Sequence, residues 1–221
     1  MKLRELAART GVAKASVKHW IREGILPPGR LRNMTTAEYG EAHVERIRLI
    51  TTLRTVFETP ISQIRELTAL LDDADVPLID VMELSQVIAS GLDREAPSGA
   101  SEDALLAQVA AAAGWSPVRS RARAALAGAL ADVAASGLPY SPDYLVEVAR
   151  ALSTIAAHDV ATARAAAPAP SRDAVALRVL VGTRAQLKVV AGMTLWAHAS
   201  AALAGEDREW AQRGSNPRPT D

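Results

Sequence analysis

The stretch LRELAARTGVAKASVKHWIREGIL, residues 3–26, decides how the first part of the chain folds. It predicts two short helices, because apolar side chains recur three and four positions apart on both sides of Thr10-Gly11. Glycine supplies the backbone freedom that a sharp turn between helices requires. The second helix also carries cations on its outer face. Such a pair is typical of a helix-turn-helix, whose second helix enters the major groove of DNA.

The predicted DNA contacts on the second helix share an outward-facing position and a polar or cationic side chain. They are Lys14, Ser16, Lys18, His19 and Arg22. Lysine and arginine can reach guanine acceptors or phosphates, while serine and histidine suit phosphate oxygens. The alternative is an ordinary solvated helix face. Trp20 falls on the apolar side, so we expect it in the core rather than against DNA.

A hairpin is predicted directly after this helix pair. Pro27-Pro28-Gly29 must end the second helix, since proline lacks a backbone donor. The polar stretch 30–39 then indicates a short β-hairpin, or wing, with Arg30, Arg32 and Asn33 as candidate contacts to the phosphate backbone. A solvated loop is the alternative for these residues.

Two further helices are predicted from apolar spacing, at residues 41–56 and from Thr59-Pro60 to residue 71. Thr59 is the expected N-cap, with Pro60 at the first helical position. The first of these helices carries three arginines, Arg46, Arg48 and Arg54. At most one is expected to touch DNA, and the others to face solvent as partners of nearby glutamates.

Residues 1–71 resemble the DNA-binding domain of the MerR family of transcriptional regulators. The resemblance is carried, in order, by LRELAARTGVA, SVKHWIREGILPPG, EYGEAHVERIRLI and ISQIRELTALL. It implies a winged helix-turn-helix followed by a helix pair. It also implies a homodimer joined by an antiparallel coiled coil, bound to double-stranded palindromic promoter DNA and acting on RNA polymerase. By the same resemblance Lys18 faces the groove, as the candidate for base readout.

The chain departs from the family pattern at three places, one of which is His19-Trp20, where the family has paired tyrosines. Ala15 stands where a cation is common, and Thr35-Thr36-Ala37 replaces a wing that usually supplies Tyr and Arg. More of the recognition is therefore expected from Lys14, Lys18 and Arg22. The wing variant resembles a branch of the family with long, wholly helical C-terminal domains.

The expected fold is mainly α, with a small hairpin wing and a helical C-terminal bundle. Residues 72–101 form a connecting helix and linker, a candidate for dimerisation. Residues 102–204 form an effector or dimerisation domain, with alanine-rich helices near 102–113, 117–135, 142–166 and 172–204. Residues 205–221 are expected to be a disordered tail.

The net charge differs in sign between residues 1–71 and residues 72–221. Residues 1–71 hold 12 Lys+Arg and 7 Asp+Glu, a net +5, whereas residues 72–221 hold 13 and 18, a net −5. A basic N-terminal part fits a polyanionic partner.

Composition and motifs argue against several other classes. The chain has no cysteine, no Gly-rich phosphate loop and no HExxH, and its four histidines share no metal-ligand spacing. We therefore expect no catalytic residues, no metal and no cofactor. No apolar run reaches the roughly 18–20 residues that span a bilayer, and no signal-peptide pattern opens the chain, so a soluble cytoplasmic protein is expected.

Four aromatic residues of the C-terminal part are candidates for a ligand pocket: Trp115, Tyr140, Tyr144 and Trp196. Aromatic-lined cavities between bundle helices are common ligand sites, and without thiolates an organic molecule is the expected effector. The alternative is that these rings fill core space between alanines. The predicted function is a homodimeric, ligand-responsive transcriptional regulator. A non-catalytic adaptor that uses the winged domain for protein contacts is the alternative.

Overall fold

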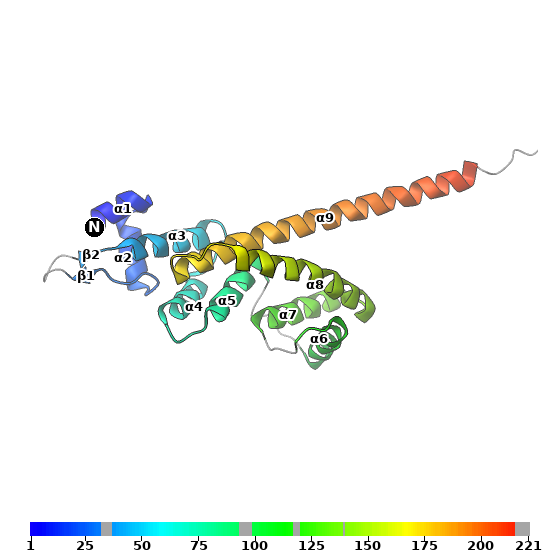
Figure 1. The fold of residues 1–221 in the computed structure, drawn as a ribbon, viewed down its shortest axis with the longest axis horizontal. Helices are drawn as coiled ribbons and strands as arrows, with labels where there is room; N and C mark the ends of the chain where they lie inside the picture. The colour runs from blue at the N-terminus through cyan, green and yellow to red at the C-terminus, as the bar shows by residue number, and fades with distance from the viewer. Residues whose placement is uncertain (32–36, 93–98, 117–119, 139, 215–221) are drawn as a thin grey trace, which may run out of the picture. The chain divides into compact units, whose positions relative to one another are not determined.

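The computed structural model describes residues 1–221 except 32–36, 93–98, 117–119, 139 and 215–221, with only the backbone described at 204–214. The described chain is mainly helical with one two-stranded hairpin, which confirms the expected fold class (Figure 1). It divides into two units, Met1–Val181 and Gly182–Asp221. A search of the described helices finds none that combines the length and the apolar character of a membrane span.

The first two helices form the predicted helix-turn-helix. Helix α1 spans Leu3–Thr10 and α2 spans Lys14–Arg22. Gly11 ends α1 with φ of 70°, the left-handed conformation that glycine adopts without steric cost. Leu6 of α1 and Val17 of α2 are completely buried, and Trp20 packs partly buried against the same core, as predicted.

A minimal hairpin follows, with β1 at Arg30–Leu31 and β2 at Ala37–Glu38. The strands are antiparallel, with Arg30 opposite Glu38 and Leu31 opposite Ala37. The N-terminus is tied to the end of this hairpin. The backbone N–H of Tyr39 donates to the Met1 carbonyl, and the Met1 amino group donates to the Tyr39 carbonyl, both at 2.8 Å.

Helices α3 (Glu41–Thr55) and α4 (Ile61–Asp72) supply the largest share of the first core. Their buried apolar residues are Val44, Ile47, Leu49, Ile50, Leu53, Ile64, Leu67 and Leu71. The predicted capping at the start of α4 is wrong: Pro60, not Thr59, occupies the N-cap position. Thr59 instead lies buried in the turn, where its backbone N–H donates to the Leu53 carbonyl at 2.9 Å.

Two more segments complete this core. Helix α5, Leu78–Ser90, buries Val81, Leu84 and Ile88 in it. The start of α9, which spans Arg172–Gly214, adds Ala176 and Leu180, both completely buried. The core of the N-terminal domain is thus closed by a helix that begins about a hundred residues beyond residue 71.

Helices α6 (Ala100–Ala113), α7 (Arg121–Ala135) and α8 (Pro142–Ala165) lie side by side as a three-helix group (Figure 1). Its buried cluster is small, made of Leu106, Ala127 and Leu130. Ser120 caps α7 by accepting from the Arg123 N–H at 3.0 Å, and Ser141 caps α8. The start of α7 is joined to α5, because the Arg121 N–H donates to Glu83 Oε1 at 2.7 Å.

The second unit contains the remainder of α9, which continues to Gly214. The helix predicted here ends at residue 204, so residues 205–214 are helical where a disordered tail was expected. The reason lies in their composition. Residues 206–213 contain good helix formers, and the first proline within 205–221 is Pro217.

Candidate nucleic-acid interface

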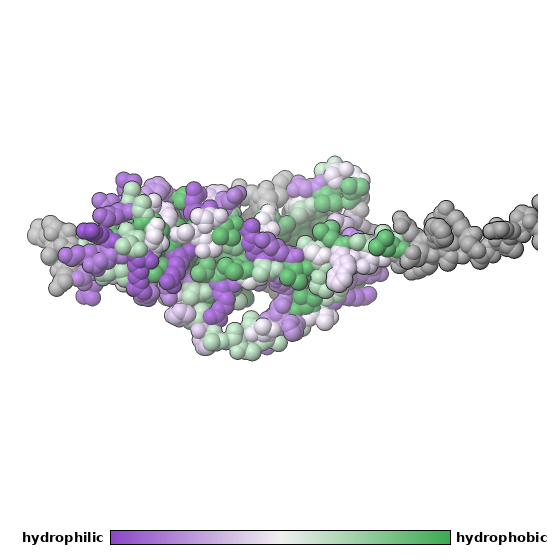
Figure 2. Space-filling model, turned by 90° about the horizontal axis from the view of Figure 1, so that it is seen from above, coloured by the Kyte–Doolittle hydropathy of each residue, from purple (hydrophilic) through white to green (hydrophobic). Residues whose placement is uncertain are grey.

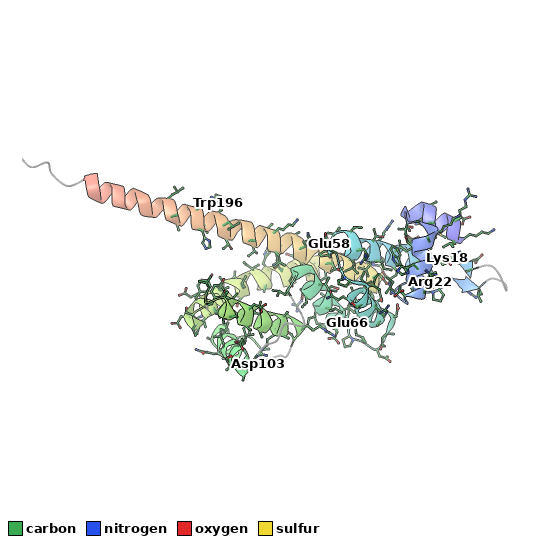
Figure 3. All side chains as sticks on the ribbon, turned by 180° about the vertical axis from the view of Figure 1, so that it is seen from behind. Lys18, Arg22, Glu58, Glu66, Asp103 and Trp196 are labelled. Atoms are coloured by element: carbon green, nitrogen blue, oxygen red, sulfur yellow. The ribbon has the colours of Figure 1, made fainter. Side chains whose placement is uncertain are left out.

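The outer face of α2 presents cations from a rigid support. Lys14, Lys18 and Arg22 recur every four residues and are all exposed, while Val17 of the same helix is completely buried. Side chains four apart lie on one face of a helix. Figure 3 labels Lys18 and Arg22 on α2, beside the hairpin. Within the described ranges, none of the three cations forms an ion pair.

The other two predicted residues of α2 differ in exposure. His19 is exposed and lies 3.9 Å from Glu23 Oε1, whereas Ser16 is only half-exposed. Figure 2 shows hydrophilic side chains gathered over the end of the molecule that carries α1 and α2. The polar character of this face therefore extends beyond the cationic row.

An acidic group beside this face is neutralised by an arginine that sequence reasoning did not identify. Arg65 of α4 donates from Nη2 to Glu23 Oε2 at 2.7 Å and from Nε to the Glu23 carbonyl at 3.0 Å. The pair reduces the repulsion that Glu23 would exert on phosphates, and it attaches the end of α2 to α4. No local sequence pattern predicts a contact between Arg65 and Glu23, which lie 42 residues apart.

The hairpin places Arg30 in β1, exposed to solvent. Arg32 and Asn33, the other predicted wing contacts, lie outside the described residues. The hairpin base is tightly packed, because a Cβ built on Gly29 would come within 2.9 Å of the Tyr39 ring. Tyr39 also meets His43 edge to face, with ring centroids 5.1 Å apart.

Arg46 of α3 corrects the sequence analysis. It was expected to face solvent, but it is 4% exposed and ion-paired to two carboxylates. Its Nη2 donates to Asp72 Oδ1 at 2.7 Å, and its Nε donates to Asp173 Oδ1. Burial alone would lower the pKa of Arg46, but hydrogen bonds and charge from both aspartates outweigh it and raise that pKa.

The first turn of α9 is held on the N-terminal core by further polar contacts. Arg172 donates from Nη2 to the carbonyls of Leu70 and Val76, both at 2.9 Å, and Ser171 donates to Glu45 Oε2 at 2.6 Å. Together with Asp173 these residues form what we call the α9 clasp, Ser171–Asp173. The clasp joins the start of α9 directly to α3, to α4 and to the connection after α4.

The four predicted pocket aromatics have different local surroundings. Trp115 follows α6 and donates from Nε1 to Ser153 Oγ at 2.8 Å. Tyr140 and Tyr144 stack on each other, with centroids 5.3 Å apart. Trp196 belongs to the second unit and is 73% exposed. Among the described residues, no group of three or more histidines and acidic side chains could hold a metal ion.

Comparison with known proteins agrees with the N-terminal geometry. Residues 1–71 match the family described as MerR HTH family regulatory protein. None of the curated proteins matches the chain. A crystal structure of SCO5550, a proposed transcriptional regulator from Streptomyces coelicolor A3(2), shares 22% identity and a TM-score of 0.48 over 91% of this chain and 96% of that one. The match to the MerR HTH family thus covers residues 1–71, the segment that contains helices α1 and α2, the hairpin, α3 and nearly all of α4.

Proposed function

We propose that this protein is a transcriptional regulator that binds palindromic promoter DNA as a homodimer, with α2 in the major groove. The observation that carries the proposal is the row Lys14, Lys18 and Arg22, exposed on a helix whose other face is anchored in a packed core. A groove-reading helix needs this combination of free cations and a rigid support. Lys18 would read bases, and Arg22 would contact phosphate one turn further on.

The proposal is tested by removing two of these cations. Lys18→Ala combined with Arg22→Ala should weaken binding to a promoter fragment and lower the slope of log affinity against log salt by about 0.9 for each lost phosphate contact. Electrophoretic shifts at several salt concentrations measure both quantities. The control is Arg150→Ala with Arg164→Ala, which removes two exposed positive charges from α8. Equal binding by the two double variants would contradict the assignment of α2 as the recognition helix.

The homodimer is proposed to form through α9. Val189, Met193, Trp196 and Leu203 are 59%, 62%, 73% and 63% exposed. Their spacing of four, three and seven residues places them on one stripe of the helix, as in a coiled-coil seam. Helix α5 lies in residues 72–101, which were also predicted as a candidate for dimerisation. It buries Val81, Leu84 and Ile88 in the core instead. A palindromic site requires two copies, and α9 offers the apolar surface to join them.

The dimer proposal predicts a monomer when charge is placed on this stripe. Met193→Glu with Trp196→Glu should convert a dimer into a monomer in sedimentation velocity, because two buried carboxylates would oppose association. Leu187→Glu is the control, since at 3.6 residues per turn Leu187 lies about 180° around the helix from Trp196. A wild-type chain that sediments as a monomer at micromolar concentration would refute the proposal.

An effector role is proposed for residues 102–204, which reach the DNA-binding domain through the α9 clasp. Ligand binding in this region could change the position of α9, and a dimer on promoter DNA would pass that change to RNA polymerase. A role at promoters agrees with the cytoplasmic location expected from the sequence. Purified dimer without affinity for any DNA at low salt would instead favour the adaptor function, in which the winged domain binds protein.

A further inference from the structure

A cavity lies within the α6–α8 group, and the DNA-binding role does not account for it. Its volume is about 410 Å³, within the range of about 300–1,000 Å³ that is usual for small-molecule sites. All three helices contribute to its wall. Large apolar side chains from each helix line it, among them Leu106 of α6, Leu126 of α7 and Leu152 of α8.

The described side chains of the wall offer no unpaired charge that could hold an ionic ligand. Among the lining residues that the structure describes, Arg123 alone is charged, and it is paired with Asp103. Its Nη1 donates to Asp103 Oδ1 at 2.7 Å and its Nη2 donates to the Asp103 carbonyl at 2.9 Å. The described part of the wall contains no carboxylate and a single aromatic ring, so it lacks the groups that bind a cationic ligand.

The polar groups of the wall are few and mostly engaged. Ser120 Oγ accepts from the Arg123 N–H as the cap of α7. The Trp115 indole N–H is committed to Ser153, whose hydroxyl in turn donates to the Ala149 carbonyl at 2.9 Å. Ser116, which follows Trp115 in the sequence, also lines the cavity and is exposed. A ligand would therefore find little capacity for more than one hydrogen bond.

Large apolar side chains of the wall remain open to solvent. Trp115 is 42% exposed, Leu126 39% and Leu152 37%. An apolar occupant would remove this surface from water, which is the main driving force for binding in such a site. Alanines at positions 110, 122 and 149 leave the space that an occupant would fill.

We propose that this cavity binds an uncharged, predominantly hydrocarbon molecule carrying at most one hydrogen-bonding group. Its role as the effector site rests on the regulatory function proposed above, whereas binding itself does not. The charge and polarity of the wall, rather than its size, set the ligand class. The described lining residues belong to helices α6–α8 and to the connection between α6 and α7, so occupancy of the cavity can be measured without DNA.

The proposal is tested with two probes that share an anilinonaphthalene ring system and differ in charge. Uncharged N-phenyl-1-naphthylamine should bind the full-length protein at one site per chain, with enhanced fluorescence and energy transfer from Trp115 that Trp115→Phe reduces. The negatively charged sulfonated analogue, 8-anilinonaphthalene-1-sulfonate, should bind with lower affinity and occupy the site in fewer chains at the same concentration. Equal binding of the two probes would overturn the proposed preference for uncharged ligands.

Matched variants locate the bound probe. Ala110→Phe, which fills the cavity from α6, should weaken binding of the uncharged probe by about tenfold or more. Ala111→Phe is the control, since Ala111 is exposed and does not line the cavity. If Ala110→Phe fails to fold by circular dichroism, Leu126→Gln places an amide on the wall from a partly exposed position and should weaken binding in the same direction. Unchanged affinity in a folded wall variant would overturn the site.

A DNA shift performed with and without the saturating uncharged probe separates this inference from the proposed function. Probe binding that alters the DNA affinity supports the cavity as an effector site. Probe binding without any change in DNA affinity supports the cavity but overturns its effector role for this ligand class. DNA binding by a chain that binds no probe overturns the cavity proposal and leaves the regulator intact.

Discussion

The DNA-binding core and the α6–α8 group are both helical, yet one is filled and the other is hollow. In the first, leucines and isoleucines from α1, α3, α4, α5 and α9 are buried together. In the second, the buried cluster contains only Leu106, Ala127 and Leu130, and a cavity of about 410 Å³ lies beside it. The difference teaches that alanine forms helices well but fills little volume where helices meet.

The two regions also differ in how they use charge. The filled core closes around Arg46, which holds carboxylates from α4 and α9, whereas Arg123 and Asp103 pair at the edge of the hollow group with the Asp103 side chain 58% exposed. Removing one partner of a buried ion pair costs much more stability than removing one partner of an exposed pair. The first region should therefore respond much more strongly to a broken pair.

The largest effect is expected from Arg46→Met, which leaves Asp72 and Asp173 facing each other without a cation. The free energy of unfolding should fall by about 3 kcal/mol, the lower end of the range for a broken buried pair, because Asp72 remains half-exposed. Urea denaturation followed by circular dichroism measures the change. Arg48→Met, on an exposed position of the same helix, should remain within about 0.5 kcal/mol of wild type. Similar losses in both variants would contradict the special role of Arg46.

A leucine pair tests the contrast between the filled and the hollow region directly. Leu180→Ala removes a completely buried side chain where α9 enters the filled core, and should cost about 2–4 kcal/mol. Leu126→Ala, at the wall of the existing cavity and 39% exposed, should cost about 1 kcal/mol. Both values come from the same denaturation experiment. A Leu126→Ala variant as damaged as Leu180→Ala would show that the α6–α8 group is packed more tightly than its cavity indicates.

The smallest effect concerns the start of α6. Glu102 accepts from the Ser101 hydroxyl at 2.8 Å and from the Gly99 N–H at 2.9 Å, and these hydrogen bonds lower its pKa. A lowered pKa stabilises the folded state above the unfolded value and loses that contribution as the pH falls through the folded value. Glu102→Gln should therefore lower the melting temperature slightly at pH 7, with the difference vanishing in acid.

Glu147→Gln on α8 serves as the control for that experiment, because it removes the same charge from an exposed position away from a helix start. Its melting temperature should follow that of wild type at both pH values. A Glu102→Gln difference that persists in acid would point to lost packing rather than to a lost carboxylate cap.

Much of the fold was accessible from local pattern. The spacing of Leu6 and Val17 around Gly11 predicts the helix-turn-helix, and Ser141-Pro142 predicts the start of α8. The exposed row on α2 follows from the same periodicity, since side chains opposite a buried face must meet solvent. The assignment of that row to DNA contacts remains a prediction, as do the proposed domain boundaries.

Other features escaped sequence reasoning for identifiable reasons. Thr59-Pro60 matches the usual cap and first-turn pattern, but the packing of the α3–α4 turn buries Thr59 and shifts the helix start to Ile61. The cavity in the α6–α8 group was missed because its wall is formed mainly by aliphatic side chains, with Trp115 as the predicted pocket aromatic that lines it. The pocket role of the four aromatics remains a prediction.

By itself the sequence determined the helices, the turn at Gly11 and the division into a basic and an acidic part, because helix periodicity, glycine conformation and charge are properties of near neighbours. Only the tertiary structure decided that Arg46 is buried, that the first turn of α9 closes the DNA-binding core, and that alanine-rich helices enclose a cavity. Each of these depends on side chains far apart in the chain, such as Arg46 and Asp173, whose encounter no local pattern encodes.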